Sequence, residues 1–380
     1  MKIKKIKARK ILDSRNNPTL EVEINSCIAK VPSGASVGKL EAKVIGIEQA
    51  ISNIKKILAP KIIGMDCVNQ EGIDRLMKSL DIGGNTMIGV SMALTRAGAK
   101  SLNLPLWKYI SNLSNNKPKI PLACFNIING GAHAQNTLDV QEFMIVPQHG
   151  RFEDRLKSAE EIYSRLEGLL LGKFKKLDAG DEGGFSPNIN DTIEALDYLK
   201  KSINVDTKII LDCAASQFFN TDSYEIDGNR FDKKQLVDYY INLVNNYPII
   251  GIEDGFAEED WDGWNEMYKQ LAEKISIIGD DLLVTDVNRI KLAAEKTACN
   301  AAIIKVNQIG TITQAIDAVN LCRALNWKTI VSHRSGETMD DFIADFSVGV
   351  ASDFIKSGAP SRPERMAKYT RLLNIEKNEI

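Results

Sequence analysis

The sequence predicts an α/β protein in which a small α+β domain precedes a barrel of alternating strands and helices. Six short apolar runs each end in a polar residue suited to a charged ligand, and each run lies about one strand and one helix beyond the last. In a barrel of parallel strands, side chains at the carboxyl ends of the strands converge on one mouth. The six residues are Asp212, Glu253, Asp280, Lys305, His333 and Lys356. Three acids followed by Lys, His and Lys indicate a metal site facing a cationic arc.

Residues 1–117 have a different pattern and form the predicted α+β domain. Two strand-like runs, residues 3–12 and 19–28, flank a turn-rich segment, and a loop of small residues follows at 32–38. Helical periodicity then covers residues 39–58, 68–80 and 89–102. The sequence Asn115-Asn116-Lys117-Pro118 is a plausible linker, so the predicted domains are residues 1–117 and 118–380.

From residue 120 onward, strand-length apolar runs alternate with amphipathic helices. The predicted helices include residues 152–170, 191–202, 233–245, 261–274 and 313–325. This alternation indicates βα units. A doubly wound open sheet is the alternative architecture. It is disfavoured because no GxGxxG or GxxxxGKS/T loop follows the first of these strands.

The composition is that of an ordinary globular protein. Hydrophobic residues make up 44% of the 380 residues and charged residues 26%, with a formal net charge of -2. We therefore expect neither a nucleic-acid partner nor a membrane partner, since no stretch approaches the ~18 to 20 apolar residues that span a bilayer. The six cysteines are scattered without a CxxC pair, which favours reduced thiols and a cytoplasmic location.

The three acids are candidate metal ligands. Asp212, Glu253 and Asp280 end successive predicted strands. Such hard oxygen ligands suit Mg²⁺ and leave coordination positions for water or substrate. The alternative is that each carboxylate ends a strand and caps the next helix. The doublets Glu253-Asp254 and Asp280-Asp281 leave the ligand open by one position, because strand alternation lets only one of each pair face the mouth.

Lys305 is the candidate general base. It ends an apolar strand, so its ammonium group is partly desolvated and near other cations, and both effects lower a lysine pKa. A neutral amine near pH 7 could then remove a proton. The alternative is a lysine that pairs with a neighbouring carboxylate. Lys356 is a second candidate base, although Lys356-Ser357-Gly358 looks more like an anion-binding loop.

Predicted loops over the mouth supply further candidates. The run His333-Arg334-Ser335-Gly336 combines imidazole, guanidinium, hydroxyl and backbone N–H groups, which suit phosphate or carboxylate oxygens. His133 lies in a Gly-rich loop. Glu182 lies in another, residues 180–187, where a carboxyl without a cationic partner could stay protonated and act as a general acid. An exposed acidic turn is the alternative.

These segments together carry a resemblance to a known family. The matching blocks run in family order over nearly the whole chain: residues 8–15, 31–36, 125–131, 141–144, 180–187, 211–216, 282–285, 305–310, 331–338 and 356–365. With them the chain closely resembles the enolase family, the phosphopyruvate hydratases of glycolysis. The resemblance implies an eight-stranded α/β barrel, an α+β domain that caps it, two Mg²⁺ ions and a homodimer.

The resemblance also implies roles for the matching residues. Asp212, Glu253 and Asp280 would hold the first Mg²⁺. Ser36 would help to bind the second. Lys305 would remove the C2 proton of 2-phosphoglycerate, and Glu182 would protonate the departing C3 hydroxyl to give phosphoenolpyruvate. The remaining expected substrate contacts are His133, Gln141, Glu142, His333, Arg334, Ser335 and Lys356.

The chain departs from the family pattern without losing any of these catalytic groups. It is shorter than typical members, and the losses fall in predicted surface loops. Asn16 stands where glycine is usual, and asparagine tolerates positive φ. Gln217 replaces a usual glutamate close to the metal ligands, which bears on their tuning. Two other functions stay open: a paralogue acting on another carboxylate, and a non-catalytic protein with this fold.

Overall fold

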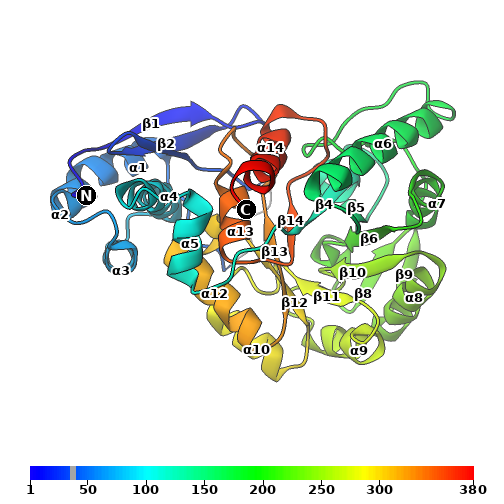
Figure 1. Cartoon of the computed structure of the whole chain (residues 1–380). Helices are drawn as coiled ribbons and strands as arrows, with labels where there is room; N and C mark the ends of the chain where they lie inside the picture. The colour runs from blue at the N-terminus through cyan, green and yellow to red at the C-terminus, as the bar shows by residue number, and fades with distance from the viewer. Residues whose placement is uncertain (35–39) are drawn as a thin grey trace.

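A three-stranded antiparallel sheet and a group of helices form the first part of the computed structural model, which describes residues 1–34 and 40–380. The strands lie in the order β1 (Ile6–Leu12), β2 (Pro18–Ile24) and β3 (Cys27–Lys30). The helices are α1 (Ile47–Asn53), the π-helical η1 (Ile54–Leu58), α2 (Ala59–Ile62), α3 (Gln70–Lys78), α4 (Gly84–Ser101) and α5 (Leu106–Ser114). Figure 1 shows this part in blue and cyan beside the barrel.

Two predictions for this part are wrong in detail. Residues 19–28 are not one strand, because Asn25 and Ser26 have φ of 47° and 67° and turn the chain between β2 and β3. The helix predicted over residues 39–58 begins only at Ile47 within the described residues. Before it, the N–H of Ala42 donates to the carbonyl of Gln308, so this backbone bonds to the barrel instead of to itself. Asn16 does adopt positive φ, 60°, as its replacement of glycine requires.

Eight strands close into a barrel in the rest of the chain, which confirms the predicted fold class. They are β4 (Leu122–Asn129), β5 (Glu142–Pro147), β6 (Thr207–Asp212), β10 (Ile249–Glu253), β11 (Ser276–Gly279), β12 (Ala301–Ile304), β13 (Lys328–Ser332) and β14 (Phe354–Lys356). Each barrel strand neighbours the next along the chain, and β14 pairs with β4 to close the ring.

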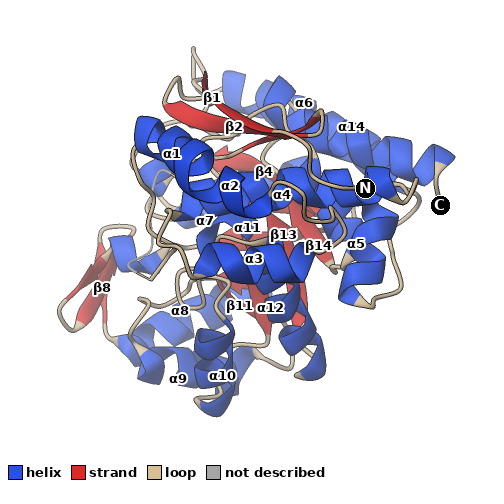
Figure 2. Ribbon diagram, turned by 90° about the vertical axis from the view of Figure 1, so that its left-hand side faces the viewer, coloured by secondary structure: helices blue, strands red, loops and turns tan. Residues whose placement is uncertain are grey.

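Helices surround this barrel and fill the connections between its strands (Figure 1). They are α6 (Phe152–Leu171), α7 (Thr192–Ser202), α8 (Lys233–Asn246), α9 (Trp261–Leu271), α10 (Val287–Glu295), α11 (Val306–Ile309), α12 (Ile312–Ala324), α13 (Phe342–Gly349) and α14 (Pro363–Asn378). After β6, the 3-10 turn η3 (Ala215–Gln217) leads into β7 (Phe219–Asn220), β8 (Ser223–Ile226) and β9 (Asn229–Phe231). Figure 2 shows this small sheet at the edge of the molecule. Among the described residues, no helix is both long and apolar enough to cross a membrane.

One strand runs against the others, which corrects the prediction of a wholly parallel barrel. β5 is antiparallel to both β4 and β6. The segment between β4 and β5 contains only the 3-10 turn η2 (Gly131–His133), whereas a parallel crossover usually needs an α-helix. Because β5 is reversed, its last residue and the start of α6 lie at the end of the barrel opposite the mouth.

The barrel interior explains how functional side chains reach the mouth. A separate apolar cluster, made of strand residues, includes Ile210, Ile278, Ile303 and Phe354. Side chains two positions apart on a strand share a face. The residues two positions beyond these four are Asp212, Asp280, Lys305 and Lys356, so each continues an inward-facing column. Cys213 packs in the other, outer core, as the alternation predicts.

The N-terminal part is fastened to the rim of this mouth. Ser33 and Gly336 exchange two backbone hydrogen bonds of 2.7 and 2.9 Å. A Cβ atom at residue 336 would lie 2.3 Å from Ser33 Oγ and 2.5 Å from Asp13 Oδ2, so this approach requires glycine. Farther out, Arg96 on α4 donates to both oxygens of Asp340 at 2.8 and 2.9 Å.

Candidate active site

The ends of neighbouring strands bring four acids together. The strand register pairs Asp212 with Glu142 on one side and with Glu253 on the other, so β5, β6 and β10 present three carboxylates side by side. Asp280 directly follows β11, the next strand. All four residues are buried, with exposures between 1% and 6%. Asp212, Glu253 and Asp280, the three acids predicted to converge on the mouth, lie there together with Glu142.

The ammonium group of Lys356 lies among three of these acids. Its Nζ is 2.8 and 2.9 Å from the two Glu253 oxygens, 3.0 Å from Glu142 Oε2 and 3.3 Å from Asp212 Oδ2. Burial lowers the pKa of Lys356, but the surrounding carboxylates outweigh burial and raise that pKa well above its ordinary value. Burial and repulsion from the neighbouring acids raise the pKa of Glu253.

Lys305 forms a direct ion pair between its Nζ and Asp280 Oδ2. Burial and the nearby cations Arg334 and Lys356 lower the pKa of Lys305, as predicted. The Asp280 carboxylate outweighs them and leaves the pKa above its ordinary value. The predicted net fall in pKa is therefore wrong for this arrangement, because the sequence did not reveal the contact with Asp280. The alternative of a lysine paired with a carboxylate describes Lys305 here.

The acidic side of the mouth fits a divalent cation by charge and by donor type. Four buried carboxylates face two ammonium groups, which leaves an excess of two negative charges. Oε2 of Glu142 forms the 3.0 Å ion pair with Lys356 and, among the described residues, accepts no hydrogen bond. Carboxylate oxygens are the donors that Mg²⁺ prefers. The donor set therefore suits Mg²⁺.

The predicted ligand trio is not gathered around one point. Among residues 1–34 and 40–380, two sets of three residues have possible ligand atoms that all lie within 4.8 Å of one another. They are His133, Glu142 and Glu182, and Asp254, Asp280 and Asp281. Lys356 lies between Asp212 and Glu253, and its contacts would have to be released before both acids held one ion.

The doublet at residues 253 and 254 is resolved by hydrogen bonding. Asp254 accepts the backbone N–H groups of Asp280 at 2.9 Å and Asp281 at 2.8 Å. Its carboxylate therefore closes the turn after β11, whereas the cap of the next helix, α9, is Asp260. Glu253 faces the other acids and Lys356, as a ligand at that position should.

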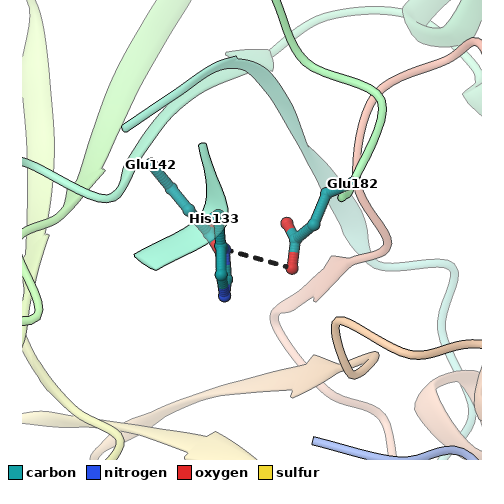
Figure 3. A group of neighbouring side chains, drawn as sticks. All are labelled: His133, Glu142 and Glu182. Carbon is teal, nitrogen blue, oxygen red and sulfur yellow. Dashed lines mark ion pairs between the residues drawn. The ribbon is translucent and has the colours of Figure 1, made fainter. Parts of the chain in front are cut away.

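On another side of the mouth, Glu182 pairs with two histidines. His133 Nδ1 lies 3.6 Å from Glu182 Oε1 and 3.4 Å from Glu142 Oε1, and Figure 3 shows this group. His333 Nε2 lies 3.2 Å from Glu182 Oε2. Burial raises the pKa of Glu182, but the two histidines outweigh burial and hold it well below its ordinary value. The prediction of a carboxyl without a cationic partner is therefore wrong.

Of the members of this group, His133 is the one whose pKa shift favours the protonated form. Burial lowers the pKa of His133, but Glu182 and Glu142 outweigh burial and raise it above its ordinary value. The His133 imidazole lies between two carboxylates that both favour its charged form. The group as a whole, and not an isolated acid, can hold and release one proton.

Comparison with known families accounts for nearly the whole chain. Residues 3–110 match the model of the enolase N-terminal domain, and residues 117–379 match that of the enolase C-terminal TIM barrel domain. The chain belongs to the enolase family. Membership supports an enzyme of the enolase superfamily with acidic groups that could bind a metal. The domain boundary between residues 117 and 118 stays a prediction.

In this enolase-family barrel, Arg365 on α14 fixes the tautomer of His333, a role that sequence reasoning missed. Arg365 Nη1 lies 2.7 Å from His333 Nδ1. A guanidinium group only donates, so Nδ1 accepts and the ring proton is on Nε2, the nitrogen facing Glu182. Burial also lowers the pKa of His333, which favours the neutral ring. Sequence gave no signal for this contact, because it joins the first turn of a helix to a loop 32 residues away.

Asn126 on β4 is a second functional residue that was not among the site residues predicted from the sequence. Its Nδ2 donates to Glu182 Oε2 at 3.0 Å. A signal was present, since Asn126 is a polar residue inside the apolar run Phe125-Asn126-Ile127-Ile128. The loop that carries Glu182 also passes close to this strand. A Cβ atom at Gly184 would lie 2.6 Å from Asn129 Oδ1, so glycine permits the approach.

The predicted anion-binding residues after β13 meet the N-terminal domain. Arg334 donates to both oxygens of Glu41 at 3.0 and 3.2 Å, and to Asn307 Oδ1 at 3.0 Å. Glu41 was not among the predicted site residues. It occupies the guanidinium fork as a carboxylate ligand would. Ser335 also lines the mouth, while Ser36 lies outside the described residues.

A chain of amides links Gln217 to the acidic side. Gln217 Oε1 accepts the backbone N–H of Ala132 at 3.1 Å, and its Nε2 donates to Gln141 Oε1 at 2.7 Å. Gln141 Nε2 in turn lies 3.3 Å from Asp212 Oδ2. Gln217 therefore sets the direction of the Gln141 amide, and through it one hydrogen bond to a candidate ligand. The expectation that residue 217 bears on the metal ligands has a structural basis.

Proposed function

We propose that this enolase-family chain catalyses the Mg²⁺-dependent, reversible dehydration of 2-phospho-D-glycerate to phosphoenolpyruvate in glycolysis and gluconeogenesis. The proposal rests on the positions of two groups suited to proton transfer, which lie on opposite sides of one mouth. Lys305 follows β12, and His133, which contacts Glu182, lies in the connection that leads from β4 into β5. In the ring of eight strands, β12 and β5 are four strands apart, so they lie across the barrel from each other.

A dehydration of this kind needs a base and an acid on different sides of the substrate. Lys305, when neutral, would take the proton from C2. The Glu182 group would deliver a proton to the C3 hydroxyl, which leaves as water because hydroxide is a poor leaving group. Since Glu182 itself is held ionised, we propose that it passes on the proton stored on His133.

The other predicted residues would bind the substrate. Arg334 and Ser335 would supply donors for the phosphate, and His333, whose one N–H faces Glu182, would contact the same region without donating to it. Lys356 would pair with the carboxylate, and Gln141 and Glu142 would support the acid side. Asp212, Glu253 and Asp280 would hold Mg²⁺, with Ser36 proposed for a second ion. Bound Mg²⁺ would supply the positive charge that stabilises the carboxylate as C2 loses its proton.

The proposal is tested with purified protein, 2-phosphoglycerate and Mg²⁺, following the absorbance of phosphoenolpyruvate. We expect turnover that EDTA abolishes and that added Mg²⁺ restores. Lack of turnover by folded protein at any Mg²⁺ concentration would overturn the proposal. Turnover of a different carboxylate would then favour a paralogue of the superfamily, and no turnover of any carboxylate would favour a non-catalytic protein.

The setting of this activity is part of the same proposal. We propose a homodimer in the cytoplasm, with a small-molecule substrate and neither nucleic acid nor membrane as partner, and a chain that is a shortened member of the family. Light scattering of the purified protein would test the dimer: twice the 42.1 kDa chain mass is expected, and the mass of one chain would refute it.

A further inference from the structure

A second cavity lies at the end of the barrel opposite the mouth. Its volume is about 680 Å³, and its lining includes the first residues of β4, β11, β13 and β14. Gln148, just beyond the last residue of β5, also lines it. The cavity is thus built from the amino-terminal ends of the parallel strands and the carboxyl end of the reversed strand. No residue of the candidate active site belongs to it.

Arg155 is the feature of this cavity that calls for a ligand. It lies in the first turn of α6, which the reversed strand brings to this end, and it is only 8% exposed. Within the described residues it forms no ion pair, and its only side-chain hydrogen bond runs from Nε to the carbonyl of Arg151 at 3.4 Å. Both Nη atoms, with four N–H groups, therefore lack hydrogen-bond partners among the described residues.

The side-chain environment of Arg155 does not neutralise it. Its guanidinium carbon is 5.9 Å from the ring centre of Phe152, a fully buried residue. Burial lowers the pKa of Arg155, and Glu376 and Asp154 offset this only partly and from beyond ion-pair distance. The Nη atoms are not among the fully buried polar atoms, so they open onto the cavity, where an anion could bind them without displacing a protein partner.

The rest of the lining is also biased toward positive charge. Lys119 is paired with Asp353 at 2.8 Å. Lys328 contacts only the hydroxyl of Ser276, at 3.3 Å, and neither Lys328 nor Lys274 has an ion-pair partner in the described ranges. Glu273 is the one other acid among the lining residues. Three unpaired cations against one unpaired acid favour an anionic occupant.

We propose that this cavity binds a small oxyanion, a phosphate or a carboxylate, through the free fork of Arg155. A guanidinium group binds such an anion with two parallel hydrogen bonds. Lys328 and Lys274 line the same cavity and would add charge. The site is separate from the mouth and does not depend on the proposed reaction.

The test is a calorimetric titration of the purified protein with inorganic phosphate at constant ionic strength. We compare wild-type protein with Arg155→Met, with Arg155→Lys, and with Lys157→Met. Lys157 is exposed on the same helix and does not line the cavity, so its variant controls for the loss of one charge. Succinate, titrated in the same way, distinguishes a carboxylate site from a phosphate site.

We expect Arg155→Met to bind one anion fewer than both wild-type protein and Lys157→Met, and Arg155→Lys to bind that anion at least tenfold more weakly. If the mouth binds no phosphate, wild-type protein should still bind one anion and Arg155→Met none. Failure of the proposed function therefore stays distinguishable from failure of this site. Equal stoichiometry and affinity in Arg155→Met and Lys157→Met, for both anions, would overturn the proposal. Should Arg155→Met not fold, wild-type crystals soaked in phosphate decide: density at the Arg155 Nη atoms supports the site, and its absence refutes it.

Discussion

The two sides of the mouth are built in different ways. The acidic side consists of residues at strand ends: Asp212, Asp280, Lys305 and Lys356 continue inward-facing columns of the barrel, and Glu253 ends β10. The histidine side consists of loop residues, Glu182, His133 and His333, which are held by side chains from elsewhere in the chain. Strand geometry alone places the first group. The second group depends on Arg365 and Asn126, so its chemistry should be the more sensitive to changes outside the mouth.

Loss of the proposed base should have the largest effect. Lys305→Ala removes the group that we assign to proton transfer at C2, and we expect turnover to fall by about 10²- to 10⁴-fold. Folding should be retained, because the strand column below Lys305 is unchanged. Lys291→Ala, an exposed lysine on α10, is the matched control. Steady-state kinetics of both variants measure the effect, and near-wild-type turnover by Lys305→Ala would remove Lys305 from the role of base.

The histidine side is tested through Arg365 without changing a mouth residue. Arg365→Lys keeps the positive charge but loses the fork that reaches His333 Nδ1. The ring is then free to place its proton on either nitrogen, and we expect turnover to fall on the order of 10- to 100-fold, as for loss of a partner that orients a functional histidine.

Nitrogen NMR of His333 provides the readout specific to this mechanism. The Nε2-protonated form should dominate in wild-type protein and should give way to a mixture in Arg365→Lys. Arg371→Lys, on the same helix but paired with Asp345 and Glu379, is the control. An unchanged tautomer in Arg365→Lys together with reduced turnover would show that Arg365 acts only through packing.

A smaller effect is expected at Gln217. Glu at this position could not donate to Gln141 Oε1, so the Gln141 amide should turn and release Asp212 Oδ2. With an additional negative charge nearby, Gln217→Glu should bind Mg²⁺ up to about tenfold more tightly. The Mg²⁺ concentration for half-maximal turnover measures this, with exposed Gln270→Glu as the control. Unchanged or weaker Mg²⁺ binding would contradict the proposed amide chain.

The smallest effect concerns the pH dependence of stability. The folded-state pKa of His133 is raised, so its charged form stabilises the fold below the ordinary histidine pKa, and this contribution is lost as pH rises through the folded pKa. His133→Asn should therefore lower the free energy of unfolding at pH 6, on the order of 1 kcal/mol, and much less at pH 9. Urea unfolding at both pH values checks this. An equal loss at the two pH values would mean that His133 is not the protonated member.

The sequence predicted the acidic side better than the histidine side for a physical reason. Strand alternation and strand spacing are local patterns, and they place Asp212, Asp280, Lys305 and Lys356 without knowledge of the rest of the fold. The protonation states do not follow from local sequence patterns. The pKa of Lys305 depends on its contact with Asp280, 25 residues earlier, and that of Glu182 depends on histidines from two other loops.

The reversal of β5 shows the same limit at the level of the fold. Apolar runs and helices predicted βα units, but no pattern within residues 142–147 states the direction of that strand. Its short connection to β4 decides the direction, and the direction in turn places α6 and Arg155 at the far end of the barrel. The second cavity is therefore a consequence of the element that the sequence pattern predicted least well.

In the proposed reaction the two sides of the mouth carry out separate steps: Lys305 removes the C2 proton, and the Glu182 group assists departure of the hydroxyl. Exchange of the C2 proton of 2-phosphoglycerate for deuterium from solvent, followed by proton NMR, reports the first step alone. Glu182→Gln should form almost no phosphoenolpyruvate but should still exchange the C2 proton, whereas Lys305→Ala should do neither. Continued exchange by Lys305→Ala, or equal loss of exchange in both variants, would contradict the account.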